Sequence, residues 1–358
     1  MSSQPRTMRV ARAYALDDVR VEEAPVPELS AGDIGVRISV CGVCSSDTLG
    51  WYVKRKLPAV LGHEPVGVVE TVTPEMEVDL EVGDRVFFHH HVPCMNCRAC
   101  QRGFYTSCRR FRETALDPGG FAEFARVPAE IVRLDVLKLP DEISDEAGVF
   151  IEPLACSLRA FGKLALDPGE SMWVLGAGPM GLLNIRLARH FGAQPIIASD
   201  PVAVRRDYAQ RTGADLALDP SAADFGDKLA EATDGWGPEN VIVGPGSAAA
   251  IESTLAHVAP GATVLVFTPT SPEASVDYRP HDLYFKEVTI THSYSAGPTD
   301  TREALELLAG GAIEVEDLVT DRFGLEGVGE ALQLVKHYGE SLRSVIYPGG
   351  LGVKVKAI

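Results

Sequence analysis

Short apolar runs separated by turns dominate the first part of the chain. Residues 9–15, 34–40, 65–72 and 85–90 are rich in apolar or β-branched side chains, and turn-forming segments such as residues 31–33 divide them. Helical periodicity is nearly absent from this part of the chain. The pattern therefore predicts a barrel-like β domain here.

The pattern changes near residue 171, where apolar runs begin to alternate with helical periodicity. Expected strands cover residues 172–175, 196–199, 216–218, 241–243, 263–267 and 288–291, and expected helices cover residues 179–191, 205–212, 224–233 and 248–258. Such alternation gives a parallel sheet with helices on both faces. Helices over 300–309 and 328–338 and a strand over 344–347 follow. The predicted fold class is α/β, with a domain boundary near Pro153.

Length and charge narrow the choice of partners. A chain of 358 residues is too long for one ordinary core, so two domains are expected. The 33 basic and 50 acidic residues give a net charge of −17, which repels phosphate backbones and anionic lipid. We therefore expect no nucleic-acid or membrane partner. The first residues contain no apolar signal segment, and no apolar run reaches about 18 residues, so a cytoplasmic location is expected.

Four cysteines form the strongest local motif. Cys94, Cys97, Cys100 and Cys108 fall within one short segment, although the whole chain contains only 7 cysteines. Four thiolates at this spacing are typical of a closed tetrahedral Zn²⁺ site, which stabilises structure and leaves no open position for a substrate. The alternative is a group of unrelated buried thiols, which this clustering disfavours. We expect a structural zinc loop over residues 94–108.

A glycine-rich turn follows the first expected strand of the second domain. Gly176, Gly178 and Gly181 have the spacing of a dinucleotide-binding turn, and Pro179 and Met180 open the helix behind it. The first glycine permits the tight turn, the second lets a pyrophosphate approach the backbone, and the third lets helix pack on strand. The helix N-terminus then faces the phosphates. The alternative is a glycine-rich turn that binds no nucleotide.

An acidic residue ends the next expected strand. The Asp200 carboxylate can accept hydrogen bonds from the adenosine ribose hydroxyls, and it would repel a 2′-phosphate. NAD is therefore favoured over NADP. Arg205 and Arg206 follow closely and keep NADP as the alternative.

A second metal-type set lies in the first domain. Cys44 is followed by the His63-Glu64 pair, so that a thiolate, an imidazole and a carboxylate occur within a short segment. Three such ligands plus water or substrate make a catalytic zinc site. A Cys41–Cys44 redox pair and a surface His-Glu dipeptide are the alternatives. Glu152 lies in an apolar run, where an acid is costly unless it is paired or bound to metal. It is a further candidate ligand, or else an acid that the N-terminus of a helix satisfies.

Taken together, these motifs resemble the zinc-containing medium-chain dehydrogenases of the alcohol dehydrogenase superfamily. The resemblance covers nearly the whole chain and is strongest to the polyol (sorbitol) and L-threonine dehydrogenase branch. It rests on residues 62–64, 83–86, the four cysteines, Glu152-Pro153, residues 176–181 and residues 341–345. It implies a GroES-like catalytic domain over residues 1–153, a Rossmann NAD-binding domain over 154–293, and completion of the catalytic domain by residues 294–358. The active site would lie between the domains.

The resemblance also implies roles for individual residues. Cys44, His63 and Glu64 match catalytic zinc ligands, and Glu152 matches a fourth ligand that alternates with water. Whether Glu64 or Glu152 completes the shell stays open. Two zinc ions per chain are expected, one catalytic and one structural. Ser46 matches the hydroxyl that takes the substrate proton, and Arg343 matches the arginine that pairs with the cofactor pyrophosphate.

The implied function is oxidation of a secondary alcohol of polyol, sugar or cyclitol type to a ketone, with hydride transfer to NAD. The alternatives are an L-threonine 3-dehydrogenase and a non-enzymatic, crystallin-like or nucleotide-sensing protein. The small-molecule substrate is not identified, although Trp51, His91 and Tyr294 are candidate pocket residues. Family members often have a histidine where this chain has Leu49, so the outer proton route must differ. A homotetramer or homodimer is expected.

Overall fold

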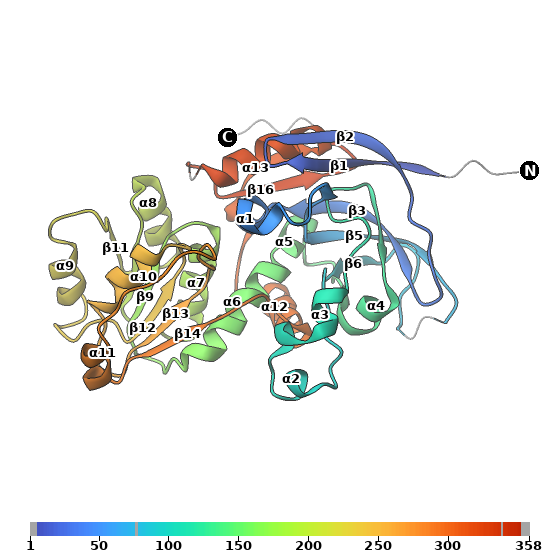
Figure 1. The fold of residues 1–358 in the computed structure, drawn as a ribbon. Coiled ribbons are helices and arrows are strands. Elements are labelled where there is room, and N and C mark those ends of the chain that lie inside the picture. The colour runs from blue at the N-terminus through green and yellow to red at the C-terminus, as the bar shows by residue number, and fades with distance from the viewer. Residues whose placement is uncertain (1–5, 76–77, 338, 352–358) are drawn as a thin grey trace, which may run out of the picture. The chain divides into compact units, whose positions relative to one another are not determined.

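The structure, a computed structural model, describes residues 6–75, 78–337 and 339–351. It divides into two compact units (Figure 1). Unit 1 consists of Met1–Ala155 and Ala296–Ile358, and unit 2 consists of Cys156–Ser295. The boundaries predicted from sequence lay after residues 153 and 293. A chain that leaves the first unit and later returns to it is the organisation that the resemblance implied.

Unit 1 contains a mixed sheet in the strand order β15-β16-β3-β5-β6-β8, with β7 paired to β3. Its strands are β3 (Ile34–Gly42), β5 (Glu64–Val72), β6 (Arg85–Phe88), β7 (Phe124–Val127), β8 (Val136–Lys138), β15 (Val319–Gly324) and β16 (Arg343–Tyr347). A smaller sheet pairs β1 (Thr7–Ala15) with β2 (Asp18–Pro25) and with β4 (Ala59–Val60). The predicted β-rich domain is confirmed, and two C-terminal strands extend its larger sheet.

Strand β3 shows why the sheet forms where it does. Ile34, Val36 and Ile38 recur at every second position, and each is at most 2% exposed. A period of two places them on one face of a strand, where they join the core of unit 1 with residues such as Val69 and Phe88. Burying a side chain of this size contributes roughly 1.5–3 kcal/mol. The central position of β3 therefore follows from its apolar face.

Strand β2 was not predicted from the sequence. It pairs with β1 along its length, and Val10 lies opposite Glu22. No residue of β2 is fully buried, and its charged residues include Arg20 and Glu22. Because neither face of β2 is buried, the strand carries no regular apolar alternation and its hydrophobic signal is weak.

Unit 2 is a parallel sheet in the order β11-β10-β9-β12-β13-β14. Its strands are β9 (Met172–Leu175), β10 (Ile196–Ser199), β11 (Leu216–Leu218), β12 (Asn240–Val243), β13 (Thr263–Val266) and β14 (Thr289–His292). Its helices are α7 (Pro179–His190), α8 (Ala203–Thr212), α9 (Phe225–Glu231), α10 (Ala248–Leu255) and α11 (Pro280–Lys286). This strand order, with its reversal between β9 and β12, is that of a doubly wound dinucleotide-binding sheet. The α/β prediction is confirmed.

The remaining helices belong to unit 1 or to the junction. They are α1 (Gly50–Val53), α2 (Arg98–Gln101), α3 (Arg109–Glu113), α4 (Ala129–Asp135), α5 (Asp145–Gly148), α6 (Ile151–Leu164), α12 (Pro298–Ala309) and α13 (Val328–Lys336). The predicted end of the last helix, residue 338, lies outside the described residues. Helix α6 was not among the predicted helices, although a helix N-terminus at Glu152 was the alternative for that residue, and the first turn of α6 does carry Glu152. Among the described residues, no helix is long and apolar enough to cross a membrane.

Candidate functional site

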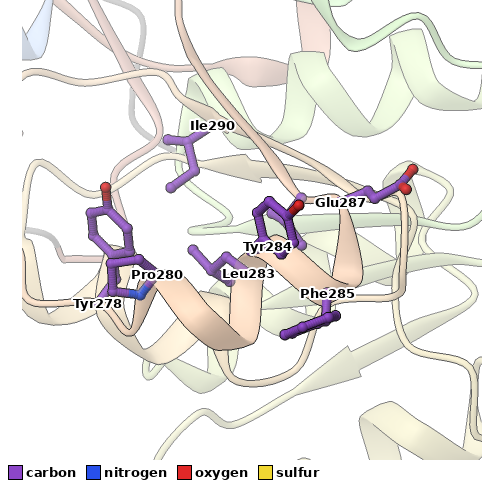
Figure 2. A pocket seen from close by; sticks show the side chains of 8 residues that line it. Tyr278, Pro280, Leu283, Tyr284, Phe285, Glu287 and Ile290 are labelled. Carbon is purple, nitrogen blue, oxygen red and sulfur yellow. The ribbon is translucent and has the colours of Figure 1, made fainter.

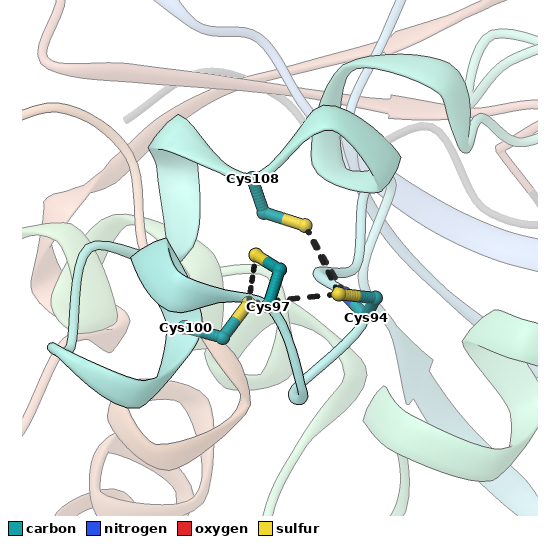
Figure 3. Close-up of side chains that lie close together, drawn as sticks. All are labelled: Cys94, Cys97, Cys100 and Cys108. Atoms are coloured by element: carbon teal, nitrogen blue, oxygen red, sulfur yellow. Dashed lines mark hydrogen bonds between the residues drawn. The ribbon is translucent and has the colours of Figure 1, made fainter.

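The four-cysteine loop forms a compact cluster of sulfur atoms (Figure 3). Cys97 precedes α2 and Cys108 precedes α3, so two short helices present their thiols to the same point. The Sγ–Sγ distances are 4.0 Å for Cys94–Cys100, 3.5 Å for Cys97–Cys100 and 3.6 Å for Cys94–Cys108. Four sulfurs at 2.3 Å from a tetrahedral zinc ion would lie about 3.8 Å apart. The donor set therefore fits a structural zinc ion.

Local packing and electrostatics both suit a metal at this position. Cys100, Cys108 and Phe111 form a small buried cluster, so the loop has little hydrophobic core to hold it. Burial alone would raise the pKa of Cys108, but backbone N–H groups, including that of Cys94 at 3.3 Å, lower this pKa to about 6. A thiol that ionises this easily is prepared for metal binding.

Cys44, His63 and Glu64 come together at the ends of two neighbouring strands. Cys44 follows β3 and begins a 3₁₀ turn, where its Sγ accepts the Ser46 N–H at 3.5 Å. His63 and Glu64 lie at the start of β5, after a turn in which Gly62 has φ +88°. One donor atom from each of the three residues lies within 4.8 Å of the other two. The structure thus assembles the predicted thiolate, imidazole and carboxylate.

Asp47 and Ser46 both contact the His63 imidazole. The imidazole Nδ1 lies 3.4 Å from Asp47 Oδ1, and its Nε2 lies 3.5 Å from Ser46 Oγ. Burial would lower the pKa of His63, but the negative charge of Asp47 raises this pKa well above its usual range. Burial raises the pKa of Cys44, yet hydrogen bonding and charge from His63 lower it overall. The lowered pKa favours the thiolate that a metal requires.

Glu64 is buried and paired with a distant residue. Its Oε2 accepts a hydrogen bond from Arg343 Nη2, and the two side chains are 1% and 4% exposed. Its Oε1 is buried and has no hydrogen-bond partner among the described residues. One oxygen therefore neutralises a guanidinium, and the other is available as a metal donor beside Cys44 and His63. This donor set fits a zinc ion.

The sequence analysis expected Arg343 to reach the cofactor pyrophosphate. That role stays a prediction; in the structure the guanidinium lies inside unit 1, against Glu64 and 5.5 Å from the centre of the Phe150 ring. Arg343 is the first residue of β16, which pairs with β3 on the opposite side from β5. Strand order thus directs this side chain toward Glu64.

Glu152 is placed beside two histidines that the sequence analysis did not select. One donor atom each from His89, His90 and Glu152 lies within 4.8 Å of the others. Glu152 does not belong to the corresponding group of Cys44, His63 and Glu64 among the described residues, although the His63 and His90 ring centroids are 5.0 Å apart. The available signal was the run of three histidines that follows a buried strand.

Three residues were candidates for the substrate pocket. His91 lies next to His90 and hydrogen-bonds through Nδ1 with the Thr114 carbonyl, and burial lowers its pKa to about 4. Trp51 on α1 packs edge-on against Tyr52, with ring centroids 5.8 Å apart. Tyr294 follows β14 in unit 2 and is 52% exposed. Their contact with substrate stays a prediction.

The glycine-rich turn in unit 2 has the backbone that its sequence predicts. Gly176 has φ +89°, and α7 begins at Pro179, directly after Gly178. A Cβ at Gly181 would overlap the Gly176 carbonyl oxygen, so only glycine fits there. A Cβ at Gly178 would lie 3.5 Å from a guanidinium nitrogen of Arg205, so a positive charge stands beside the turn. The arrangement fits a dinucleotide pyrophosphate.

Asp200 also stabilises this turn by accepting hydrogen bonds from its backbone. It is buried, and its two carboxylate oxygens accept the Ala177 N–H at 2.9 Å and the Val202 N–H at 2.8 Å. Each oxygen keeps a second lone pair for a ribose hydroxyl. Arg206 donates to the Asp200 carbonyl oxygen at 2.7 Å and pairs with Asp219 at 3.3 Å. These contacts engage Nη1 of the guanidinium that would favour a 2′-phosphate.

Comparison with known proteins agrees with this geometry. An alcohol dehydrogenase GroES-like domain matches residues 30–141, and a zinc-binding dehydrogenase domain matches residues 179–310. The chain is 33% identical over 344 residues to probable D-xylulose reductase A of Aspergillus clavatus, and 31% identical over 344 residues to L-threonine 3-dehydrogenase of Pyrococcus abyssi. Each alignment covers 92% of this chain and 94% of the relative.

Solved structures show the same fold. A zinc-binding dehydrogenase of Sinorhizobium meliloti 1021, bound to NADP, has a TM-score of 0.85 at 28% identity and covers 96% of this chain and 100% of its own. A short chain alcohol dehydrogenase (rspB) of E. coli CFT073, complexed with NADH, has a TM-score of 0.85 at 26% identity and covers 95% and 99%. The chain is therefore an oxidoreductase that belongs to the zinc-binding alcohol dehydrogenase family, in its polyol and L-threonine dehydrogenase branch.

Proposed function

We propose that this enzyme oxidises a secondary alcohol of polyol, sugar or cyclitol type to a ketone, with transfer of hydride to NAD. The observation that carries the proposal is the close set of Cys44, His63 and Glu64, with the Ser46 hydroxyl 3.5 Å from His63. A zinc ion bound to this set would supply Lewis-acid chemistry by polarising the substrate hydroxyl. Cys94, Cys97, Cys100 and Cys108 would hold the second, structural zinc ion.

Ser46 would handle the substrate proton. A hydroxyl group can accept one hydrogen bond and donate another, so Ser46 Oγ can take the proton of an alcohol bound beside His63 and pass it on. Leu49 carries no group that could continue this path. The proton would therefore leave through water or through a cofactor hydroxyl.

Unit 2 would bind the cofactor. The turn at Gly176, Gly178 and Gly181 and the Arg205 guanidinium would hold the pyrophosphate, and Asp200 would hold the adenosine ribose. The bound nicotinamide would accept the hydride. Because one structural relative binds NADP and another NADH, the cofactor choice rests on residues of this chain, and the Asp200 carboxylate supports NAD.

A second candidate substrate class is amino alcohols of the L-threonine type. The 31% identity to the Pyrococcus enzyme is close to the 33% identity to the xylulose reductase, so identity does not separate them. A screen of polyols, sugars, cyclitols, L-threonine and simple secondary alcohols with NAD and NADP, followed through absorbance of the reduced cofactor, tests both. Turnover confined to L-threonine would replace the first candidate. Full activity of a metal-free Cys44→Ala variant would contradict both.

We also propose that the chain forms a homodimer or homotetramer. Strand β14 ends the parallel sheet of unit 2, so one edge of its backbone pairs with no other strand among the described residues. Tyr278, Tyr284 and Phe285 beside it are 53%, 76% and 73% exposed (Figure 2). An apolar group at a sheet edge supports pairing with a second copy. Light scattering of the purified protein would give its mass in solution.

We propose a cytoplasmic location as well. All of the cysteines are free thiols in the structure. Clustered thiols that are kept for metal binding are typical of a reducing compartment. Fractionation of cells that express the tagged chain would test this location.

A further inference from the structure

A basic run at the end of α1 has no acidic partner. Lys54, Arg55 and Lys56 are consecutive and exposed, in a chain whose net charge is −17. Arg12 and Arg85 of the same unit lie against carboxylates, whereas the cations of this run form no ion pair within the described part of the chain. The run is therefore a local positive patch in an acidic protein, and its charge is available to an anionic ligand.

The backbone fixes this run close to the proposed proton acceptor. The 3₁₀ helix η1 (Ser45–Thr48), which contains Ser46, directly precedes α1, and the two helices pack together. The Lys56 N–H donates to the carbonyl of Val53, the last residue of α1, at 2.8 Å. Val53 is only 2% exposed and belongs to the core of unit 1. The basic run is thus attached to a buried anchor beside the segment that carries Ser46.

Tyr52 positions the last two cations of the run. Its ring packs against the core of unit 1, and Lys56 Nζ lies 4.3 Å from the ring centroid and donates to the Tyr52 hydroxyl at 3.2 Å. The guanidinium carbon of Arg55 lies 5.9 Å from the same centroid. A neutral aromatic ring attracts a cation without cancelling its charge. The ammonium group has two further N–H donors, so it can bind an anion while it keeps this contact.

Lys56 lies near the histidines that lead to His63. Burial lowers the pKa of His91 to about 4, and the positive charge of Lys56 adds to this effect. The ring centroids of His91 and His90 are 4.3 Å apart, and those of His90 and His63 are 5.0 Å apart. A substrate that is bound at His63 and extends along this row therefore brings its far end toward the ammonium group.

We propose that the substrate carries a terminal phosphate ester and that Lys56, together with Arg55, binds this group. The inference deepens the proposed function and rests on it for the oxidised carbon, which would lie at Cys44, His63 and Glu64. A phosphate monoester carries a charge of about −1.5 to −2 at pH 7 and three strong acceptor oxygens. A guanidinium supplies paired donors to such a group, and an ammonium supplies a compact charge. A carboxylate carries a single negative charge, so a run of three cations favours the phosphate.

Paired substrates test the proposal. Pentitols and hexitols are assayed with NAD and the zinc-loaded chain, each as the free polyol and as its terminal phosphate ester. The parent should prefer the phosphate by roughly 10- to 100-fold in kcat/KM, the usual effect of a hydrogen bond to a charged group. Lys56→Gln should remove most of this preference by raising KM for the phosphate, and Lys56→Arg should restore most of it. Because the preference is a ratio, a general loss of activity does not change it.

Lys54→Gln is the matched control. It removes the same charge from the same run, but the cations that lie on the Tyr52 ring are Arg55 and Lys56. This variant should keep the parent preference. Equal kcat/KM for the free and the phosphorylated polyol in the parent would overturn the proposal and leave the proposed function standing. An equal loss of preference in Lys54→Gln and Lys56→Gln would also overturn it, because the run would then act only through its overall charge.

Calorimetry separates this inference from the proposed function. The zinc-loaded chain saturated with the reduced cofactor cannot oxidise an alcohol, so titration with a hexitol phosphate measures binding alone. Its Kd should rise roughly 10- to 100-fold in Lys56→Gln, and it should rise with added salt in the parent because the cations are exposed. Absence of binding, or a Kd that Lys56→Gln leaves unchanged, would overturn the proposal. Binding by a chain that oxidises no polyol would contradict the proposed function and leave this inference standing.

Discussion

Glu64 and Arg343 form a buried ion pair across the strand that separates theirs, although 279 positions lie between them in the chain. β16 and β5 flank β3, and Gly42 of β3 stands opposite Glu64 in the register. A Cβ at Gly42 would overlap Glu64 Oε2 and lie 2.9 Å from Arg343 Nη2. The missing side chain of Gly42 is thus the space in which the pair forms.

Removal of Arg343 alone should be strongly destabilising. Arg343→Met leaves Glu64 buried without its partner, and breaking a buried pair in this way costs about 3–5 kcal/mol. The double variant Glu64→Gln/Arg343→Met should recover much of this loss because no buried charge remains. Urea unfolding measures both, with Arg20→Met, at an exposed pair, as the control that should change little. Equal stability of the single and double variants would contradict the interpretation.

A side chain at Gly42 should disturb the pair and the predicted metal set together. Gly42→Ala is expected to cost about 1–3 kcal/mol as an overpacked core position. It should also lower zinc content, because Glu64 must move to admit the methyl group. Gly35→Ala is a control on the same strand, where the nearest atoms would be 3.4 Å away. Unfolding free energy and zinc content should both stay close to the parent values in the control, and a Gly42→Ala protein that matches it would contradict the prediction.

Much of unit 2 could be predicted from the sequence, because each buried parallel strand is a continuous apolar run between turn residues. All of β9 is buried, for example, and its predicted bounds are those observed. The start of helix α6 was weighed only as an alternative for Glu152, because the Glu152-Pro153 pair in its first turn looked like a boundary. β2 was missed because its exposed faces carry charge. Local apolar content thus explains both the successes and the failures.

The candidate site also has residues that the sequence could suggest and contacts that it could not. Cys44, His63 and Glu64 lie close together in the chain, so spacing alone could suggest them. The partners of these residues come from strand order and from distant helices. Arg343 reaches Glu64 only because β16 lies beside β3, and Asp135 orients His89 from α4. Such pairings depend on tertiary contacts and leave no local pattern in the sequence.

Ser46→Ala should separate chemistry from metal binding. If Ser46 takes the substrate proton, its loss should lower kcat by roughly 10²–10⁴-fold, the usual contribution of a positioned acid–base group. Zinc content should not change, because the Cys44 thiolate and the His63 imidazole remain. Ser45→Ala, at the exposed neighbouring position, is the matched control and should retain parent kinetics. Unchanged kcat in Ser46→Ala would assign the proton to another group.

Stability should depend on pH through Glu146. Arg322 binds both carboxylate oxygens of Glu146, at 2.6 Å each, and the Tyr347 hydroxyl also donates to it. Burial would raise the pKa of Glu146, but these hydrogen bonds and the charge of Arg322 lower it overall. The folded protein therefore binds the proton less readily than the unfolded chain. This contribution to stability is complete above the ordinary glutamate pKa of about 4.3 and is lost as the pH falls through the lower, folded value.

Thermal unfolding of the parent and of Glu146→Gln at several pH values would measure this contribution. The difference in Tm should be largest near neutral pH and should shrink as the pH falls below about 4, because the parent carboxylate is then protonated as well. Arg322→Met should reduce the same pH dependence, since it removes the donor that lowers the pKa of Glu146. A Tm difference between parent and Glu146→Gln that stays constant from pH 7 to pH 3 would show that Glu146 contributes through packing and not through its charge.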